Sequence, residues 1–249
     1  MRATAFPLAL LLACSGGEAP EEVRTVEPDE VAPASAPDEA SQRAAGPAEA
    51  REAPSPVADV THAAPEGVPA VPEPKVGSWV RYRLDWREGG RSFTEYRVVG
   101  RDDDALIVEV TDRRSEGEQH ARIVFVPNAG PGGHRLVSLS FKGPRGVEPI
   151  PERLLPQFAP MLQQWLGMLL PESLEGDTRE TVRVPAGTFV GSAGVARELD
   201  YGGQTMRADV WLHPEVPITG MVRFAGQGQD GHRLEVLEYG LEGARSAFD

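Results

Sequence analysis

Alternating apolar and polar residues recur in short segments along most of the chain, and this pattern constrains the fold more than any other feature. In the first segment Val80, Tyr82 and Leu84 share one face, while the residues between them are polar or charged. A period of two residues is typical of half-buried β-strands, and the short turns between segments indicate an antiparallel meander. The predicted strands cover residues 80–86, 92–99, 106–110, 121–125, 136–141, 180–184, 188–199, 205–212, 220–225 and 232–239. About ten strands are too many for a flat sheet, so we expect a mainly β domain whose antiparallel sheet curls into a barrel, a half-barrel or a sandwich.

Two prolines predict a stiff corner between the strands 205–212 and 220–225. Pro214 and Pro217 each lack an amide donor, and each pushes the residue before it towards extended geometry. Gly220 then releases the chain into the next strand. We interpret this corner as a part of the scaffold that holds two strands in register, without chemistry of its own.

An apolar helix interrupts the strands between residues 151 and 174. Its apolar residues fall at i, i+3, i+4, i+7 and i+8, which is typical of one face of an α-helix. We expect the helix to have Pro160 in its first turn and to end at Pro171. The five residues of the stripe are Leu162, Trp165, Leu166, Leu169 and Leu170. Three interpretations remain open: the helix plugs the core on the open side of the sheet, covers an apolar ligand cavity, or contacts a membrane or a partner.

Residues 1–14 combine one basic residue with a short apolar run that ends in the only cysteine of the sequence. The run is too short to span a bilayer and has the length of a signal-peptide apolar region. Leu11-Leu12-Ala13-Cys14 resembles the bacterial lipobox. The resemblance implies that residues 1–13 are a lipoprotein signal peptide and that Cys14 carries acyl chains such as palmitate, which anchor stably in a membrane. By the same resemblance, Ser15 favours the outer membrane.

The composition changes sharply between the cysteine and Gly77. Residues 15–76 contain no Leu, Ile, Phe, Tyr or Trp, and they hold 11 of the 23 prolines and a net charge of −9. Such a segment buries too little apolar surface to offset the entropy of ordering, so we expect residues 14–76 to be a disordered tether. The globular domain is then expected at residues 77–249. The acidic balance argues against nucleic acid as a partner.

Candidate catalytic and metal-binding groups are sparse. The five histidines stand at no helical metal-ligand spacing, and no Gly-rich segment has the pattern of a phosphate loop. With Cys14 acylated, no thiol remains for a metal site or a nucleophile. His213 and Glu215 form one local acid–base pair, which we interpret as two exposed turn residues beside Pro214. We therefore expect no enzyme, no cofactor and no metal site.

Two resemblances bear on function. Three C-terminal segments resemble a motif set in uncharacterised bacterial envelope proteins. They are V-P-A-G-T-F (184–189), V-W-L-H-P-E-V-P-I-T-G-M-V-R-F (210–224) and L-E-V-L-E-Y-G (234–240). A long antiparallel meander interrupted by an apolar helix is similar in architecture to the periplasmic lipoprotein-carrier superfamily. That resemblance implies an unclosed β-barrel that binds acyl chains.

We therefore expect a lipid-anchored protein of the cell envelope that binds an apolar ligand, such as a lipid or an acyl chain, beneath the helical stripe. The alternative is a structural or assembly module that binds another envelope protein. A ligand site needs an unfilled volume of roughly 300 Å³ between helix and sheet. The assembly module instead needs an exposed apolar patch or a free sheet edge.

Overall fold

Strands make up most of the folded chain. The computed structural model describes residues 59–249 apart from 87–89, 116, 130–132, 202–203 and 228–231. The strands are β1 (Thr61–His62), β2 (Trp79–Trp86), β3 (Arg91–Asp102), β4 (Ala105–Arg114), β5 (Gly117–Val126), β6 (Arg135–Gly143), β7 (Gly146–Pro149), β8 (Thr178–Val184), β9 (Gly187–Tyr201), β10 (Gln204–Leu212), β11 (Met221–Gly226) and β12 (His232–Gly240). A 3-10 turn, η2 (Glu152–Leu154), leads into the helix α2 (Leu155–Leu169).

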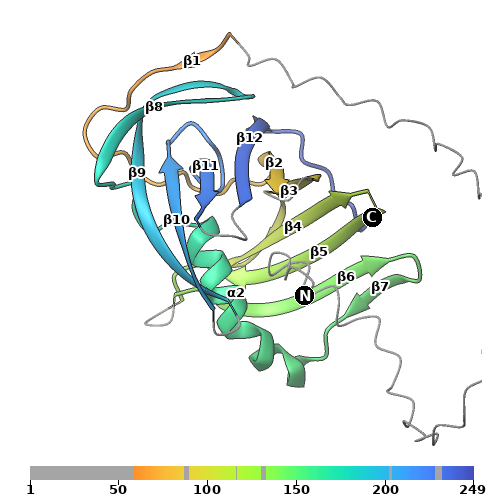
Figure 1. The fold of residues 1–249 in the computed structure, drawn as a ribbon. Coiled ribbons are helices and arrows are strands. Elements are labelled where there is room, and N and C mark those ends of the chain that lie inside the picture. The colour runs from red at the N-terminus through yellow and green to blue at the C-terminus, as the bar shows by residue number, and fades with distance from the viewer. Residues whose placement is uncertain (1–58, 87–89, 116, 130–132, 202–203, 228–231) are drawn as a thin grey trace, which may run out of the picture.

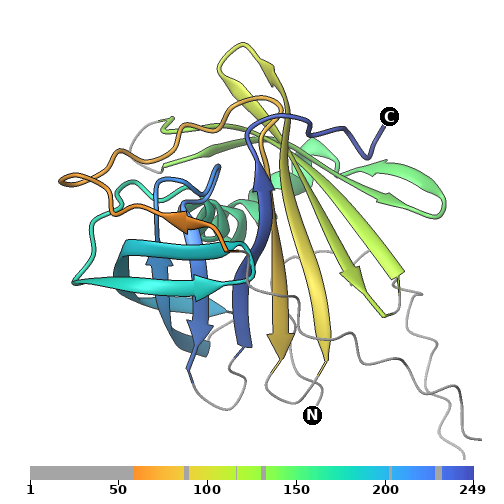
Figure 2. The same ribbon diagram turned by 90° about the horizontal axis from the view of Figure 1, so that it is seen from above.

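The described strands join into one open sheet of twelve strands. Their order is β1-β9-β10-β11-β12-β2-β3-β4-β5-β6-β7, and β8 pairs with β9. Strand β1 runs parallel to β9, whereas the successive strands of the meander are antiparallel. Figures 1 and 2 show the sheet curled around α2, which lies on its concave side. The prediction of a mainly β, curled antiparallel sheet with one inserted helix is confirmed.

Alternation along the strands decides which side chains enter the core. Val80, Tyr82 and Leu84 of β2 are buried on the concave side, whereas Arg81 and Arg83 between them point outward into ion pairs. Strand β12 pairs with β2, so the first and last strands of the meander lie side by side. Burial of one face of every central strand therefore produces a continuous apolar core under α2.

The proline corner joins β10 to β11, next to a shift in their register between Trp211 and Leu212. The amide of His213 donates to the carbonyl of Gly220 at 2.7 Å, which joins the end of β10 to the start of β11. The hydroxyl of Tyr82 donates to the carbonyl of Met221 at 2.8 Å, so the corner is also held to β2. Val216 and Ile218, between the strands, are fully buried and belong to the core.

The helix begins earlier than the sequence suggested. Its first residue is Leu155, with Pro156 in the first turn, and Pro160 lies inside the helix rather than in that turn. Proline within a helix removes a hydrogen bond and crowds the preceding turn. The apolar face nevertheless extends back to Leu155, which is buried, and Phe158, which packs against the core. This added burial accounts for the extra turn in spite of Pro160.

Residues 59–76 also differ from the prediction, because they lie along the sheet rather than in a tether. Thr61 and His62 pair with Thr188 and Phe189 of β9, and the His62 ring stacks on Phe189 at 4.1 Å between centroids. Val71 packs against the core. The folded part therefore begins before the predicted boundary at residue 77. The remainder of the predicted tether, the signal peptide and Cys14 lie outside the described residues.

Candidate functional site

The helical stripe is assembled as the sequence predicted. The exposed fractions of Leu162, Trp165, Leu166, Leu169 and Leu170 range from 0 to 7 %. The Trp165 ring lies 5.7 Å from the ring of Tyr96 on β3, measured between centroids. The five side chains therefore face the concave side of the sheet together and belong to the main core.

The space beside the stripe is small. We call it the Trp165 cavity, and its volume is about 20 Å³, room for a single water molecule. It is lined by Leu84, Thr94, Tyr96, Asp112, Arg114, Trp165 and Leu234. A drug-sized ligand needs roughly 300 Å³ or more. In this conformation the Trp165 cavity is too small for such a ligand, which agrees with the core-plug interpretation.

The Trp165 cavity has one polar end. Asp112 is 4 % exposed, and the guanidinium of Arg114 lies 2.7 Å from its carboxylate. The Thr94 hydroxyl donates to the same carboxylate at 3.3 Å. Buried charges require this kind of pairing, since an isolated charge in an apolar core is strongly unfavourable. The concave side thus combines an apolar floor with an ion pair at its edge.

Of the two residues expected to be exposed beside Pro214, Glu215 is exposed and His213 is not. His213 is 1 % exposed, in contrast to the expected exposed turn residue. Its Nδ1 accepts from the amide of Glu215 at 3.3 Å, and its Nε2 lies 3.1 Å from the carbonyl of Ala63, to which it must donate. Burial lowers the pKa of His213, so the ring is held neutral. Both ring nitrogens serve the backbone and tie the segment around Ala63 to the corner.

The described residues include no group of three His, Cys, Asp or Glu side chains that could hold a metal ion. No described helix combines the length and apolarity needed to cross a membrane.

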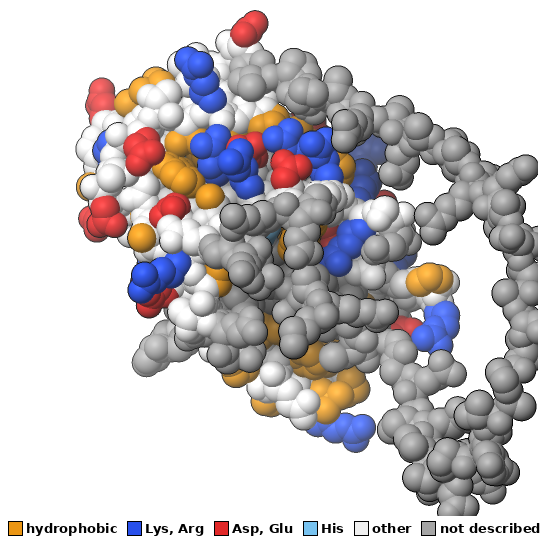
Figure 3. All heavy atoms as spheres, viewed as in Figure 1, with side chains coloured by type: hydrophobic (Ala, Val, Ile, Leu, Met, Phe, Trp, Pro, Cys, Tyr) orange, Lys and Arg blue, Asp and Glu red, His pale blue; other side chains and the backbone are white. Residues whose placement is uncertain are grey.

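The outer face of the sheet carries a network of ion pairs. Arg83 and Arg223 both bind Glu235, at 2.7 and 3.0 Å. Arg122 binds Glu109 at 2.8 Å. Figure 3 shows basic and acidic side chains side by side over the upper part of the molecular surface. Most of the charge on this part of the protein is therefore compensated locally.

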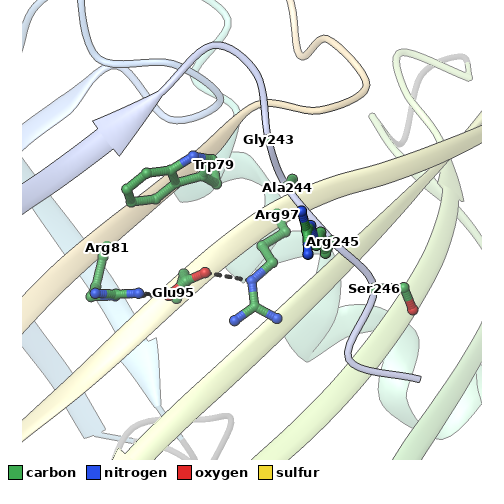
Figure 4. A pocket seen from close by; sticks show the side chains of 8 residues that line it. All are labelled: Trp79, Arg81, Glu95, Arg97, Gly243, Ala244, Arg245 and Ser246. Atoms are coloured by element: carbon green, nitrogen blue, oxygen red, sulfur yellow. Dashed lines mark hydrogen bonds and ion pairs between the residues drawn. The ribbon is translucent and has the colours of Figure 1, made fainter. Parts of the chain in front are cut away.

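A groove on this face forms a second candidate site, which we call the outer groove. It has a volume of about 410 Å³. It is lined by Trp79, Arg81, Glu95, Arg97, Gly243, Ala244, Arg245 and Ser246. Figure 4 shows the first four residues on two neighbouring strands, β2 and β3, with the C-terminal segment (residues 241–249) passing over them. Its volume falls in the range of small-molecule sites.

Glu109 anchors the far end of the C-terminal segment. This carboxylate is fully buried on β4 and accepts from the Ser246 hydroxyl at 2.9 Å and from the Ala247 amide at 2.7 Å. The Arg122 guanidinium, which also binds Glu109, lies 4.4 Å from the ring centre of Phe248. At the near end, the Ala244 amide donates to the carbonyl of Gly77 at 2.8 Å. The segment is thus attached on both sides of the outer groove and forms its wall.

The outer groove is only partly encoded in local sequence patterns. The polar positions of the strands 80–86 and 92–99 place Arg81, Glu95 and Arg97 outside the core, and this much is visible in the pattern. Nothing in the sequence of residues 241–249 indicates that they return across these strands. The chain matches no protein-family model and no curated protein.

Proposed function

We propose that this protein is a non-catalytic binding protein of the cell envelope that takes up an apolar ligand, a lipid or an acyl chain, on the concave side of its sheet. The observation that supports this most is the packing of the uncharged helix α2 across the concave side of a curled sheet. Because the Trp165 cavity holds only about 20 Å³, ligand entry requires α2 to move away from the sheet.

The ends of α2 favour such a movement. The N-cap residue of α2 makes no side-chain hydrogen bond to the helix. The first turn has no acidic residue and the last turn has no basic residue, so neither end carries a charge that complements the helix dipole. Pro160 interrupts its hydrogen bonds. The position of α2 therefore depends on apolar packing, and an acyl chain on the concave side replaces that packing with similar contacts.

Anchoring is the second part of the proposal. An acylated Cys14 attaches the protein to a membrane, preferably the outer membrane, and the acidic segment that follows spaces the domain from the surface. Metabolic labelling with a palmitate analogue tests this directly. Label incorporated into the wild-type chain and lost from Cys14→Ser supports the anchor, whereas labelling of neither protein argues against it.

A brominated fatty acid tests the apolar site, because bromine quenches the fluorescence of a neighbouring tryptophan. The full chain with Cys14→Ser is titrated, alongside versions that also carry Trp165→Phe or Trp211→Phe. Trp165 lies on α2 and is buried between the helix and the sheet, whereas the Trp211 indole donates to Glu180 on the outer face at 3.0 Å. We expect saturable quenching that Trp165→Phe reduces and Trp211→Phe leaves in place. Quenching that is absent, or that survives Trp165→Phe in full, contradicts the proposal.

The assembly module is the second candidate, and one observation favours it. Strand β7 pairs with β6 at the end of the sheet, and Val137 and Val147 on these strands are 40 and 48 % exposed. An exposed edge with apolar side chains can add a strand from another protein. A photo-crosslinking residue at Val147, compared with one at Arg207 on β10, tests this edge in cells. A discrete adduct with an envelope protein at Val147 alone supports the alternative, and its absence argues against it.

A further inference from the structure

We propose that the outer groove is a binding site for a phosphate group carried by a small molecule or by a lipid headgroup. It lies on the opposite side of the sheet from the proposed apolar site and does not depend on that proposal. Three guanidinium groups, from Arg81, Arg97 and Arg245, line the groove together with the carboxylate of Glu95. This concentration of positive charge occurs in a protein whose formal net charge is −13.

Arg97 supplies most of the unused hydrogen-bonding capacity. A guanidinium carries five N–H donors. The described contact of Arg97 is a bond from its Nε to Glu95, and its terminal nitrogens make no described hydrogen bond. The side chain is only 13 % exposed. These terminal nitrogens are not among the buried unpaired atoms of the described residues, so they reach the solvent of the groove, where an anion can take the place of water.

Glu95 holds two of the guanidinium groups in place without neutralising the groove. Its carboxylate binds Arg97 on one oxygen and Arg81 on the other, the latter at 2.6 Å. Burial alone raises the pKa of Glu95, but the hydrogen bonds from Arg97 and Arg81 outweigh it and lower that pKa. The carboxylate therefore stays ionised and orients both arginines before any ligand arrives. Arg81 is further engaged by Glu238 at the rim, which leaves Arg97 and Arg245 for the ligand.

Arg245 adds a second guanidinium to the groove. It lies on the C-terminal segment, is exposed, and has no described ion pair. By contrast, Arg83, Arg122 and Arg223 each bind a carboxylate within 3.0 Å. Two guanidinium groups without a full complement of partners, lining one groove, match an anion with several oxygens. Phosphate fits this arrangement because arginine binds it through paired N–H bonds.

The shape of the groove adds a preference for the rest of the ligand. The indole of Trp79 forms one wall, and its Nε1 donates to the carbonyl of Glu242 at 3.2 Å, which fixes the ring. The groove also exceeds the size of a free phosphate ion. We therefore expect a phosphate monoester with a flat or apolar group to bind more tightly than inorganic phosphate.

Calorimetry with phenyl phosphate tests the site on the full chain carrying Cys14→Ser. Arg245→Ser removes an exposed side chain and leaves the described ion pairs intact, so its fold is not at risk. Arg97→Gln removes the half-buried guanidinium on β3. Arg207→Ser is the matched control, since Arg207 is an exposed arginine on β10. Loss of a charged hydrogen bond predicts at least about tenfold weaker binding for Arg245→Ser and for Arg97→Gln, with no change for Arg207→Ser.

Two results overturn the proposal. In the first, the unsubstituted protein binds neither phenyl phosphate nor phosphatidate vesicles. In the second, it binds one of them, and Arg245→Ser leaves that binding unchanged. The two ligand sources are separated by flotation with phosphatidate vesicles and with phosphatidylcholine vesicles. Phosphatidate binding lost in Arg245→Ser, without phenyl phosphate binding, assigns the site to a lipid headgroup. Phenyl phosphate binding without vesicle binding assigns it to a soluble phosphate monoester.

Discussion

Replacing Glu109 by glutamine tests how the C-terminal segment is held over the outer face. Oε1 of Glu109 accepts from Arg122 at 2.8 Å and from the Ser246 hydroxyl at 2.9 Å, while Oε2 accepts from the Ala247 amide at 2.7 Å. Glutamine has the same shape but only one accepting oxygen. If that oxygen keeps Arg122 and Ser246, the new NH₂ group faces the Ala247 amide, and two donors then point at each other.

The expected loss of stability follows from these contacts. A hydrogen bond to a charged group contributes about 1.5–3 kcal/mol, and the Ala247 amide loses one. Arg122 is 32 % exposed and reaches solvent, so the loss of its full ionic partner adds no more than about 1 kcal/mol. We expect Glu109→Gln to lower the free energy of unfolding by about 2–3 kcal/mol in total.

Urea unfolding measures this loss, and hydrogen exchange at the Ala247 amide reports on the segment itself. We expect that amide to lose protection in Glu109→Gln while amides in the central strands keep theirs. Glu118→Gln is the control, because Glu118 pairs with Arg113 on an exposed surface and should change stability by less than about 1 kcal/mol. An unchanged unfolding midpoint together with a protected Ala247 amide refutes the anchor.

Three further predictions concern the core and the N-terminal strand. Leu166→Ala should lower the free energy of unfolding by about 3 kcal/mol in urea titrations, because Leu166 is fully buried. Leu166→Met keeps most of the volume and should lower it by less than about 1.5 kcal/mol. Equal effects of the two substitutions would contradict solid packing of α2. The free energy of unfolding should fall as the pH drops below 6.5, because burial lowers the pKa of His213 in the folded protein and the unfolded chain then binds more protons. In His213→Gln, the free energy of unfolding plotted against pH should have a shallower slope. An identical slope would exclude His213 as the cause. Gly187→Ala should release β1, because Gly187 has φ +142° and an added Cβ would lie 2.6 Å from the carbonyl oxygen of Val60. Limited proteolysis of the variant should then cut near residue 60. A resistant variant would show that β1 is held in another way.

The ten predicted strands all occur, because each has enough alternating residues to bury one face. The sequence gives β2 as residues 80–86, and the structure has Trp79–Trp86. The two strands that were missed carry no such signal. Thr61–His62 is two residues long and is held by backbone pairing with β9 and by stacking on Phe189, which are contacts between distant parts of the chain. β7, with Gly146 and Pro149, lies mostly exposed at the edge of the sheet and has no apolar face.

The candidate sites also include features with a local sequence signal and features that depend on contacts between distant parts of the chain. The helical stripe was predictable because its spacing is local, and its members are indeed buried together. Whether space remains beneath it depends on how closely Tyr96 and Leu84 approach Trp165, which no local pattern encodes. The burial of His213 was also missed, because its partner Ala63 comes from a segment with the composition of a tether. The outer groove requires residues 241–249 to cross β2 and β3, and their sequence has no periodicity that indicates such a course.

The two proposed sites use opposite faces of the same strands, and this arrangement lets them act separately. On β3, Tyr96 points to the concave side and contacts Trp165, while its neighbour Arg97 points outward into the outer groove. Each site is closed by a different segment, α2 on one side and the C-terminal segment on the other. No side chain is shared, so changes at Trp165 and at Arg245 should add in their effects on stability within about 0.5 kcal/mol. A larger deviation from additivity would mean that the sheet between the two sites transmits strain. The geometry of the outer groove would then depend on the position of α2.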